Sequence, residues 1–340
     1  MKRKIIGIFV CMLIISTVFT VSGTTIMEKT SMLAYLEGNT LYVGGFGPGN
    51  YTSIQDAIDN ALDGDTVFVY DDSSPYFENL IVDKAITLIG ENRETTIIDG
   101  NQNGNVIYVT VNYVTLSGFT IKNGKDSYLF AGVDVYANFT TISNNIIKNN
   151  YIGIAFWNND DGNYGTITHS NVISDNIIIS NSFEGLWLHF CKHSIVENNT
   201  LRDNYFSSIH MYSASDNLIQ GNNISNNIYG ISLYEDSNSN EVSRNNIVNN
   251  VRYSIAILES GRNNISQNNF IESGRRNVKL IFSIWTLKRN KWNGNYWGIS
   301  KEQPHFIIVR ISIRRPGFVG LSIIPWINID WNPAEEPYDI

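Results

Sequence analysis

The sequence predicts an all-β protein: a single solenoid of about ten coils with a short capping helix near its N-terminus. A short asparagine-rich motif recurs along the chain. One asparagine from each of five successive copies is separated from the next by 23, 24, 23 and 23 residues: Asn176, Asn199, Asn223, Asn246 and Asn269. Short β-branched triplets such as Ile177–Ile179 fill each period, and no stretch has helical periodicity long enough for one helix per repeat. A sustained period of this length indicates a repeat architecture of stacked strands.

The composition supports an ordered, extended repeat. About 45 of the 340 residues are asparagine, about 38 of them between positions 101 and 300, and only 7 are proline. Hydrophobic residues make up 43% of the chain and charged residues 16%, which is enough apolar material for a long core. The formal net charge is -8 with a pI near 5.2, so the chain lacks the basic footprint of a nucleic-acid-binding protein. We therefore expect no nucleic-acid partner.

Residues 1–23 are expected to be a secretory signal peptide. Basic residues at positions 2–4 precede an apolar run from Ile5 to Val21, and small residues follow. Loss of these three cations would change the charge of -8 to -11. Cleavage near Thr24 would yield a secreted or cell-surface protein. Retention of the segment as an anchor stays open and is the one case in which a membrane is a partner.

Residues 24–95 are expected to form an N-terminal cap and the first coils. Ser53 is placed to cap an amphipathic helix that begins at Ile54, where apolar residues recur at helical spacing. A turn at Asp63–Asp65 then leads into a strand at Thr66–Tyr70. Such a cap is needed because a bare stack of strands would expose its apolar core and open edges to water.

Residues 96–295 are expected to hold the repeats, each one a triangular coil of a parallel β-helix. The leucine framework of leucine-rich repeats is absent, and Ile and Asn dominate instead. An asparagine at the same corner of each coil can hydrogen-bond to the asparagines above and below it, and it tolerates the left-handed backbone of a sharp corner. The expected ladder comprises Asn145, Asn176, Asn199, Asn223, Asn246 and Asn269. The segment 296–340, rich in Trp and Pro, is expected to cap the far end and to include a strand at Phe306–Ile311.

These motifs resemble a known superfamily. The segments Tyr51–Ile58 and Ile86–Gly90 resemble the pectate-lyase-like right-handed parallel β-helix proteins, and within them the NosD-like branch, over about residues 40–295. The ends Asn295–Gly298 and Asp330–Ala334 resemble the tail of archaeal surface proteins of this group. The branch includes carbohydrate-binding proteins, sugar hydrolases and periplasmic copper-maturation proteins. The resemblance implies a right-handed β-helix, a scaffold on which function must be argued from a site.

Alignment of the repeats predicts a strand in each coil whose side chains alternate between core and solvent. The inward series begins at Ile154, Leu186, Ile209, Ile231, Ile255 and Val278. Alternation then places six rings on one outer face: Trp157, Trp187, His189, His210, Tyr212 and Tyr234. Flat rings beside a carboxylate such as Asp236 suit the binding of a sugar face and its hydroxyl groups. We therefore expect a polysaccharide or surface glycan as ligand. The alternative is that these rings only stack on one another between strands.

Whether the protein is an enzyme stays open at this stage. Hydrolysis needs two carboxyl groups about 5–9 Å apart, and elimination often uses a calcium-bound acidic cluster with a base. The acidic candidates beside the ring-bearing face are Asp160, Asp161, Glu184, Glu235 and Glu259. The Asn-Thr-Asp, Gly-His-Gly and Asp-Pro-His signatures of related polygalacturonases and epimerases are absent. A polysaccharide lyase or hydrolase is the second hypothesis.

A third hypothesis is a NosD-like metal-handling role. The run His189, Cys191 and His193, with His210 one coil away, contains ligands that suit copper. A coil corner within the run would break this set, and a lone Cys is most often a small buried apolar residue. The sequence thus predicts no cofactor, with calcium or copper as alternatives. A purely structural rod in the cell envelope is the fourth hypothesis.

Overall fold

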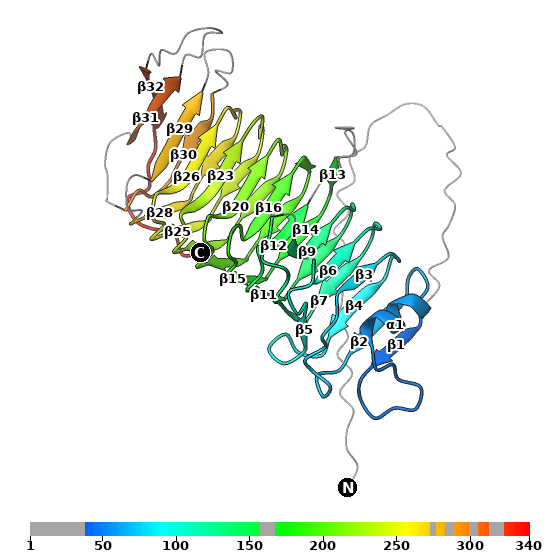
Figure 1. The fold of residues 1–340 in the computed structure, drawn as a ribbon. Helices are drawn as coiled ribbons and strands as arrows, with labels where there is room; N and C mark the ends of the chain where they lie inside the picture. Colours follow the sequence, from blue (N-terminus) through cyan, green and yellow to red (C-terminus); the bar gives the residue numbers. More distant parts are fainter. Residues whose placement is uncertain are drawn as a thin grey trace, which may run out of the picture. The chain divides into compact units, whose positions relative to one another are not determined.

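The described residues form a parallel β-helix with one short helix near its N-terminal end (Figure 1). The computed structural model describes residues 38–128, 130–156, 167–272, 277–282, 289–298, 305–312 and 323–340. All of these belong to one compact unit, Glu37–Ile340, so the expected signal peptide lies outside the described residues. Each complete coil contributes one strand to each of three sheets, here named A, B and C. The predicted solenoid of about ten coils is confirmed.

The strands of the three sheets follow one another in chain order. Sheet A contains β1 (Thr40–Val43), β2 (Thr66–Val69), β4 (Thr87–Gly90), β7 (Thr115–Ser117), β10 (Thr141–Ser143), β14 (Val172–Ser174), β18 (Ile195–Glu197), β21 (Leu218–Gln220), β24 (Glu241–Ser243), β27 (Asn264–Ser266) and β30 (Lys291–Asn293). Sheet B contains β5 (Ile97–Asp99), β8 (Thr120–Lys122), β11 (Ile146–Lys148), β15 (Ile177–Ile179), β19 (Thr200–Arg202), β22 (Asn223–Ser225), β25 (Asn246–Val248) and β28 (Asn269–Ile271).

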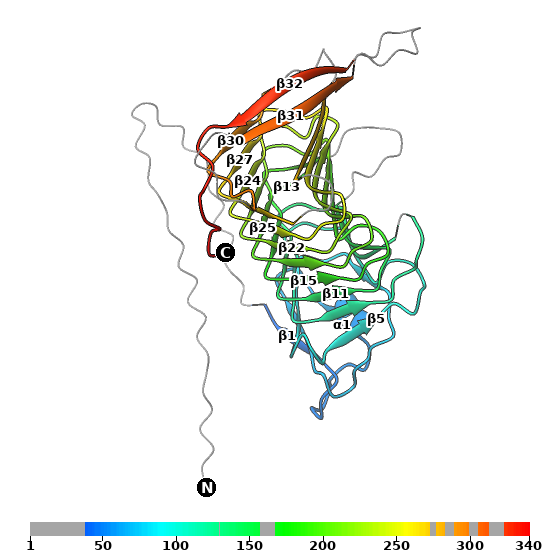
Figure 2. The ribbon, with the colours of Figure 1, turned by 90° about the vertical axis from the view of Figure 1, so that its left-hand side faces the viewer.

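Sheet C has the longer strands. It contains β3 (Leu80–Val82), β6 (Ile107–Val109), β9 (Ala131–Val135), β12 (Ile152–Phe156), β16 (Leu186–His189), β20 (Ser207–Tyr212), β23 (Tyr229–Tyr234), β26 (Tyr253–Leu258), β29 (Val278–Phe282), β31 (His305–Ser312) and β32 (Ile323–Asp330). A short pair, β13 (Thr168–His169) and β17 (Cys191–Lys192), lies between sheets C and A. β32 runs antiparallel to β31 at the C-terminal end of the stack, which Figure 2 shows. β31 includes the strand predicted at Phe306–Ile311.

The helix α1 (Ile54–Asn60) is the predicted capping helix. Ser53 caps it, because its hydroxyl oxygen accepts a hydrogen bond from the Asp56 backbone N–H. The carboxylate of Glu78 also accepts hydrogen bonds from the first backbone N–H groups of the helix at 2.9 Å. The apolar side of α1 is buried and contacts β1, β2 and β3. Within the described ranges, no helix has the length and apolar character that crossing a bilayer requires.

Asparagine ladders run along the corners of the solenoid. At the corner between sheets A and B, each side-chain amide donates to the side-chain oxygen of the asparagine on the next coil at 2.9–3.2 Å. This ladder comprises Asn145, Asn176, Asn199, Asn222, Asn245, Asn268 and Asn295. Equivalent ladders follow sheet B from Asn150 to Asn250 and precede sheet A from Asn217 to Asn290. All three corners of the coil are therefore closed by buried amides.

The predicted ladder is correct in kind and wrong by one residue in half of its members. Asn223, Asn246 and Asn269 begin the strands of sheet B, and the ladder residue is the asparagine before each. The position of the left-handed backbone also differs from the expectation. It belongs to the residue before the ladder asparagine, for example Asn198 at φ 56° and Arg244 at φ 53°. The ladder asparagine itself hydrogen-bonds through its amide and is fully buried, which explains why the corner needs both residues.

Candidate functional site

The register of sheet C is the one that the sequence predicts. Ile154 pairs with Leu186, and the same row continues on the next coils through Ile209, Ile231, Ile255 and Val278. These side chains are buried in the core. The residue after each of them faces outward, so Trp187 and His210 are paired neighbours on the outer face, and His189, Tyr212 and Tyr234 form the next outward row. Trp157 lies outside the described residues.

The rings on this outer face are partly buried because they pack on one another. Trp187 and His210 stack with centroids 5.6 Å apart and an interplanar angle of 13°. His210 meets Tyr234 edge-on at 5.0 Å, and His189 meets Tyr212 at 5.0 Å and 60°. The spacing of stacked strands, about 4.8 Å, matches the distance at which rings attract each other. The expectation of freely exposed rings is therefore corrected: Trp187, His189, His210, Tyr212 and Tyr234 are each half-buried.

A buried acid and a histidine meet in the middle of this face. The side chain of Glu184 is fully buried, and its Oε1 lies 2.7 Å from Nδ1 of His210. Its Oε2 accepts a hydrogen bond from the Ser207 backbone N–H at 2.9 Å. Burial raises the pKa of the Glu184 carboxyl, and the hydrogen bond and charge of His210 oppose that rise. Nε2 of His210 is buried and has no hydrogen-bond partner among the described residues.

The other predicted acidic residues do not join this pair. Glu235, Asp236 and Glu259 occupy the turns that follow sheet C, where they adopt a left-handed backbone with φ of 45°, 60° and 51°. Glu235 and Asp236 are exposed there. Asp160 and Asp161 lie outside the described residues. Glu184 is thus the one predicted carboxylate that the described part of the chain places under the rings.

A second acid on the same face was missed from the sequence. Asp134 is 3% exposed and lies in the outward row of sheet C, paired with Tyr108 on one side and Ala155 on the other. Its Oδ2 accepts a hydrogen bond from Asn105 at 2.7 Å, and its Oδ1 has no partner among the described residues. Burial raises the pKa of Asp134 to about 7. The alternation Val133, Asp134, Val135 could have revealed it if the alignment had been extended by one coil.

The predicted metal ligands are not brought together. Cys191 is fully buried against the core, where burial raises the pKa of its thiol, and its Sγ contacts Ser194 Oγ at 3.2 Å. Phe190 and His193 both have a left-handed backbone, so the chain turns on each side of Cys191 and its strand alternation is lost. His193 is exposed at a corner. Within the ranges that the structure describes, no group of three or more His, Cys, Asp or Glu residues is arranged to hold a metal ion. These residues do not fit copper.

The three parallel sheets define a parallel β-helix protein. The chain belongs to the NosD family: the sequence model described as "Periplasmic copper-binding protein (NosD)" matches residues 58–301. No curated protein matches this chain in sequence.

Solved structures share the fold at low sequence identity. The A-module of the mannuronan C-5 epimerase AlgE6 from Azotobacter vinelandii is 15% identical with a TM-score of 0.57, over 73% of each chain. XylC in complex with xylose is 12% identical with a TM-score of 0.59, over 82% of this chain and 72% of that one. An alginate lyase from Paenibacillus sp. str. FPU-7 is 15% identical with a TM-score of 0.52, over 71% of this chain and 97% of that one. These similarities establish the architecture.

Proposed function

We propose that this protein is exported and binds polysaccharide on the outer face of sheet C. The observation that carries the proposal is the row of rings from Trp187 to Tyr234, held on a rigid sheet around the Glu184–His210 pair. Tyr128, 56% exposed, extends this row, with its ring 6.3 Å from that of Trp187. Ring edges and phenol groups presented at the strand spacing suit successive sugar units of an extended chain.

The relatives support this proposal. The family is described as periplasmic, which agrees with the export signal expected at residues 1–23. The epimerase is named for mannuronan and the lyase for alginate, which are both polysaccharides. Both share the β-helix fold of this chain.

Binding is expected to depend on the outermost rings. The double variant Tyr128→Ala and Tyr212→Ala should weaken binding to the preferred polysaccharide about tenfold or more, because it removes two ring contacts from the solvent side of the face. Affinity electrophoresis of the full-length protein in gels that contain acidic or neutral polysaccharides measures this change. Tyr205→Ala is the matched control, because Tyr205 is 66% exposed before β20, outside the outward rows of the face. Equal loss in the control and the double variant would contradict the proposal.

A second candidate function is a polysaccharide lyase, and the Glu184–His210 pair favours it. A carboxylate that accepts Nδ1–H leaves Nε2 as the basic nitrogen of the imidazole. This nitrogen could take the proton from the carbon next to the carboxylate of a uronic acid. The electron pair of that C–H bond then forms a carbon–carbon double bond, the glycosidic C–O bond breaks, and the leaving oxygen takes a proton from water. Trp187 and Tyr234 pack on the imidazole, so the substrate reaches Nε2 only when one of these rings moves.

If the lyase hypothesis is correct, Glu184→Gln should lower turnover about a hundredfold, because the neutral amide no longer holds His210 in the required tautomer. The measurement is the ultraviolet absorbance of unsaturated ends released from polyuronates. A wild-type protein that binds polysaccharide and releases no product would support binding as the function and contradict the lyase hypothesis.

A further inference from the structure

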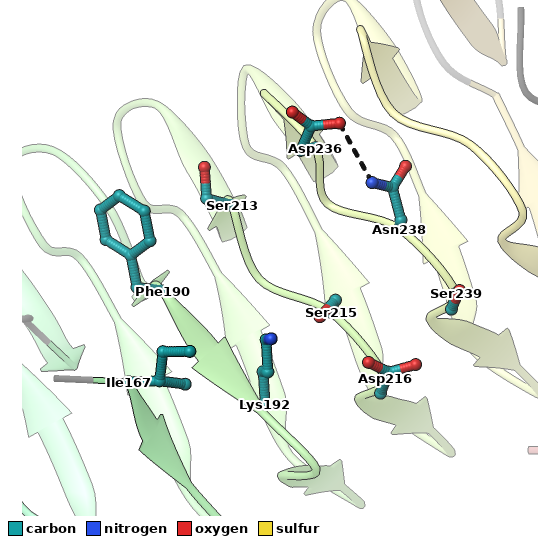
Figure 3. A pocket seen from close by; sticks show the side chains of 9 residues that line it. All are labelled: Ile167, Phe190, Lys192, Ser213, Ser215, Asp216, Asp236, Asn238 and Ser239. Carbon is teal, nitrogen blue, oxygen red and sulfur yellow. Dashed lines mark hydrogen bonds between the residues drawn. The ribbon is translucent and has the colours of Figure 1, made fainter. Parts of the chain in front are cut away.

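A pocket, which we call the corner pocket, lies in the turn between sheets C and A (Figure 3). Its lining comes from three successive coils, at residues 190–192, 213–216 and 236–239, together with Ile167. Its volume of about 360 Å³ is at the lower end of the range of about 300–1,000 Å³ that is typical of small-molecule sites. The corner pocket therefore has room for one small molecule and not for an extended chain.

The hollow exists because the middle coil contributes small side chains. Lys192 on the first coil forms a parallel bridge with Ser215 on the second. Figure 3 shows Ser215 between Lys192 and Asn238 of the third coil. Ser213 lies in the same way between larger side chains of the neighbouring coils. The two serines thus form the floor of the corner pocket, and the coils on each side form its walls.

Both walls are held in place by contacts within the protein. On the third coil, Nδ2 of Asn238 donates to Oδ1 of Asp236 at 3.2 Å. Oδ1 of Asn238 accepts a hydrogen bond from the Gly261 backbone N–H at 2.7 Å. On the first coil, the ring of Phe190 contacts the ring of His189 with centroids 4.5 Å apart. Because these groups are already positioned, a ligand would bind with a small cost of ordering them.

Most groups that line the corner pocket can form hydrogen bonds. They are the side chains of Lys192, Ser213, Ser215, Asp216, Asp236, Asn238 and Ser239. Phe190 supplies one aromatic surface on the first wall. Among the residues that the structure describes, neither Lys192 nor Asp216 has an ion-pair partner. Many donors and acceptors around a single ring favour a ligand with several hydroxyl groups and one apolar face, which describes a sugar.

The charge of the lining limits the kind of sugar. One ammonium group, on Lys192, and two carboxylates, on Asp216 and Asp236, give the lining a net charge of -1. A sugar that carries a carboxylate would be repelled by this charge, whereas a neutral sugar can donate its hydroxyl groups to the carboxylates. The lining therefore favours a neutral sugar.

We propose that the corner pocket binds one neutral sugar unit. The apolar face of the sugar packs on Phe190, and its hydroxyl groups bond to Asp236 and Asn238 on the opposite wall. Lys192 and the floor serines hold the remaining hydroxyl groups. The corner pocket shares no residue with the outward rows of sheet C, so this proposal does not depend on the proposed function.

The test is titration of the full-length protein with glucose, galactose, mannose and glucuronate, followed by saturation-transfer difference NMR. We expect at least one of the three neutral sugars to bind, and glucuronate to bind at least about tenfold more weakly than that sugar. Ser215→Leu should weaken the neutral sugar about tenfold or more, because the larger side chain fills the hollow. Ser225→Leu is the matched control, because Ser225 is a half-buried serine in sheet B, and it should leave binding unchanged.

A second variant tests the charge argument. Asp216→Asn with Asp236→Asn keeps the shape of the lining and changes its net charge from -1 to +1. Asparagine tolerates the left-handed backbone at these two positions, where φ is 59° and 60°, so the variant should fold like the wild type. We expect glucuronate to bind this variant about tenfold more tightly than it binds the wild type.

Three results would overturn the proposal. They are a wild-type protein that binds none of the neutral sugars, a Ser215→Leu variant that binds the neutral sugar as the wild type does, and a doubly substituted variant with an unchanged preference between neutral sugar and glucuronate. Tyr128→Ala alters sheet C alone and should keep the neutral sugar. Polysaccharide binding on sheet C is measured with separate ligands and separate variants, so either proposal can fail while the other holds.

Discussion

Asn222→Ala is expected to lower the free energy of unfolding by about 3–5 kcal/mol, whereas Asn223→Ala should change it by less than about 0.5 kcal/mol. Asn222 is a fully buried member of the ladder at the corner of sheets A and B. Its amide nitrogen donates to the Val196 carbonyl at 2.9 Å and to the Asn245 side chain at 2.9 Å. Its oxygen accepts both the backbone N–H and the side-chain amide of Asn199 at 3.0 Å. Alanine would leave several buried groups without partners.

Asn223 is the matched control because it is the same residue type, one position later. Its side chain is exposed at the start of β22, where its oxygen accepts a hydrogen bond of 3.3 Å from Asn246. Urea denaturation followed by circular dichroism measures both variants. Similar losses of stability in the two variants would contradict the register of the ladder in the structure.

Asp134→Asn is expected to raise the stability of the protein at pH 8 by about 3–4 kcal/mol. Burial raises the pKa of Asp134 from 3.8 to about 7 in the folded protein. Between about pH 4 and about pH 7 the unfolded chain loses its proton and the folded chain keeps it, so wild-type stability falls as the pH rises through this range. Above about pH 7 Asp134 is ionised in both the folded and the unfolded protein, and the loss of wild-type stability is complete. An amide has no charge to bury, and its oxygen can still accept the hydrogen bond from Asn105.

The measurement is the urea midpoint of wild type and variant at several pH values from 4 to 8. Near pH 4 the two proteins should be almost equally stable, because the wild-type carboxyl is protonated there in the folded state. This convergence is the internal control. A difference that stays constant from pH 4 to pH 8 would show that the amide acts through packing and that Asp134 is not ionised at a cost in the folded protein.

The register of sheet C could be derived from the sequence because one long-range pattern specifies it. Ile209, Ile231 and Ile255 recur at the repeat period, and alternation along each strand assigns the core and the outside from them. The choice between neighbouring asparagines could not be made in the same way, since both Asn222 and Asn223 recur once per coil. The spacing of 24 between Asn199 and Asn223 was the sign of the slip, because the true ladder spacing there is 23.

The candidate site was predicted less completely than the fold. Trp187, His210 and Tyr234 lie on the outer face as expected, but their exposure depends on side-chain packing between coils that a linear pattern does not contain. The pairing of Glu184 with His210 crosses from one coil to the next over 26 residues. The break in the His189, Cys191 and His193 set arises from turns whose position depends on the whole coil.

The sequence by itself determined the repeat, the number of coils, the capping helix and the inward face of sheet C. These properties follow from the repeat period and from the alternation along each strand, which both recur many times in the linear sequence. Only the tertiary structure decided which asparagine carries each ladder, how far the rings are buried, and that Asp134 and Glu184 are buried acids. Each of these depends on contacts between coils, where residues more than 20 positions apart meet at a spacing of about 4.8 Å.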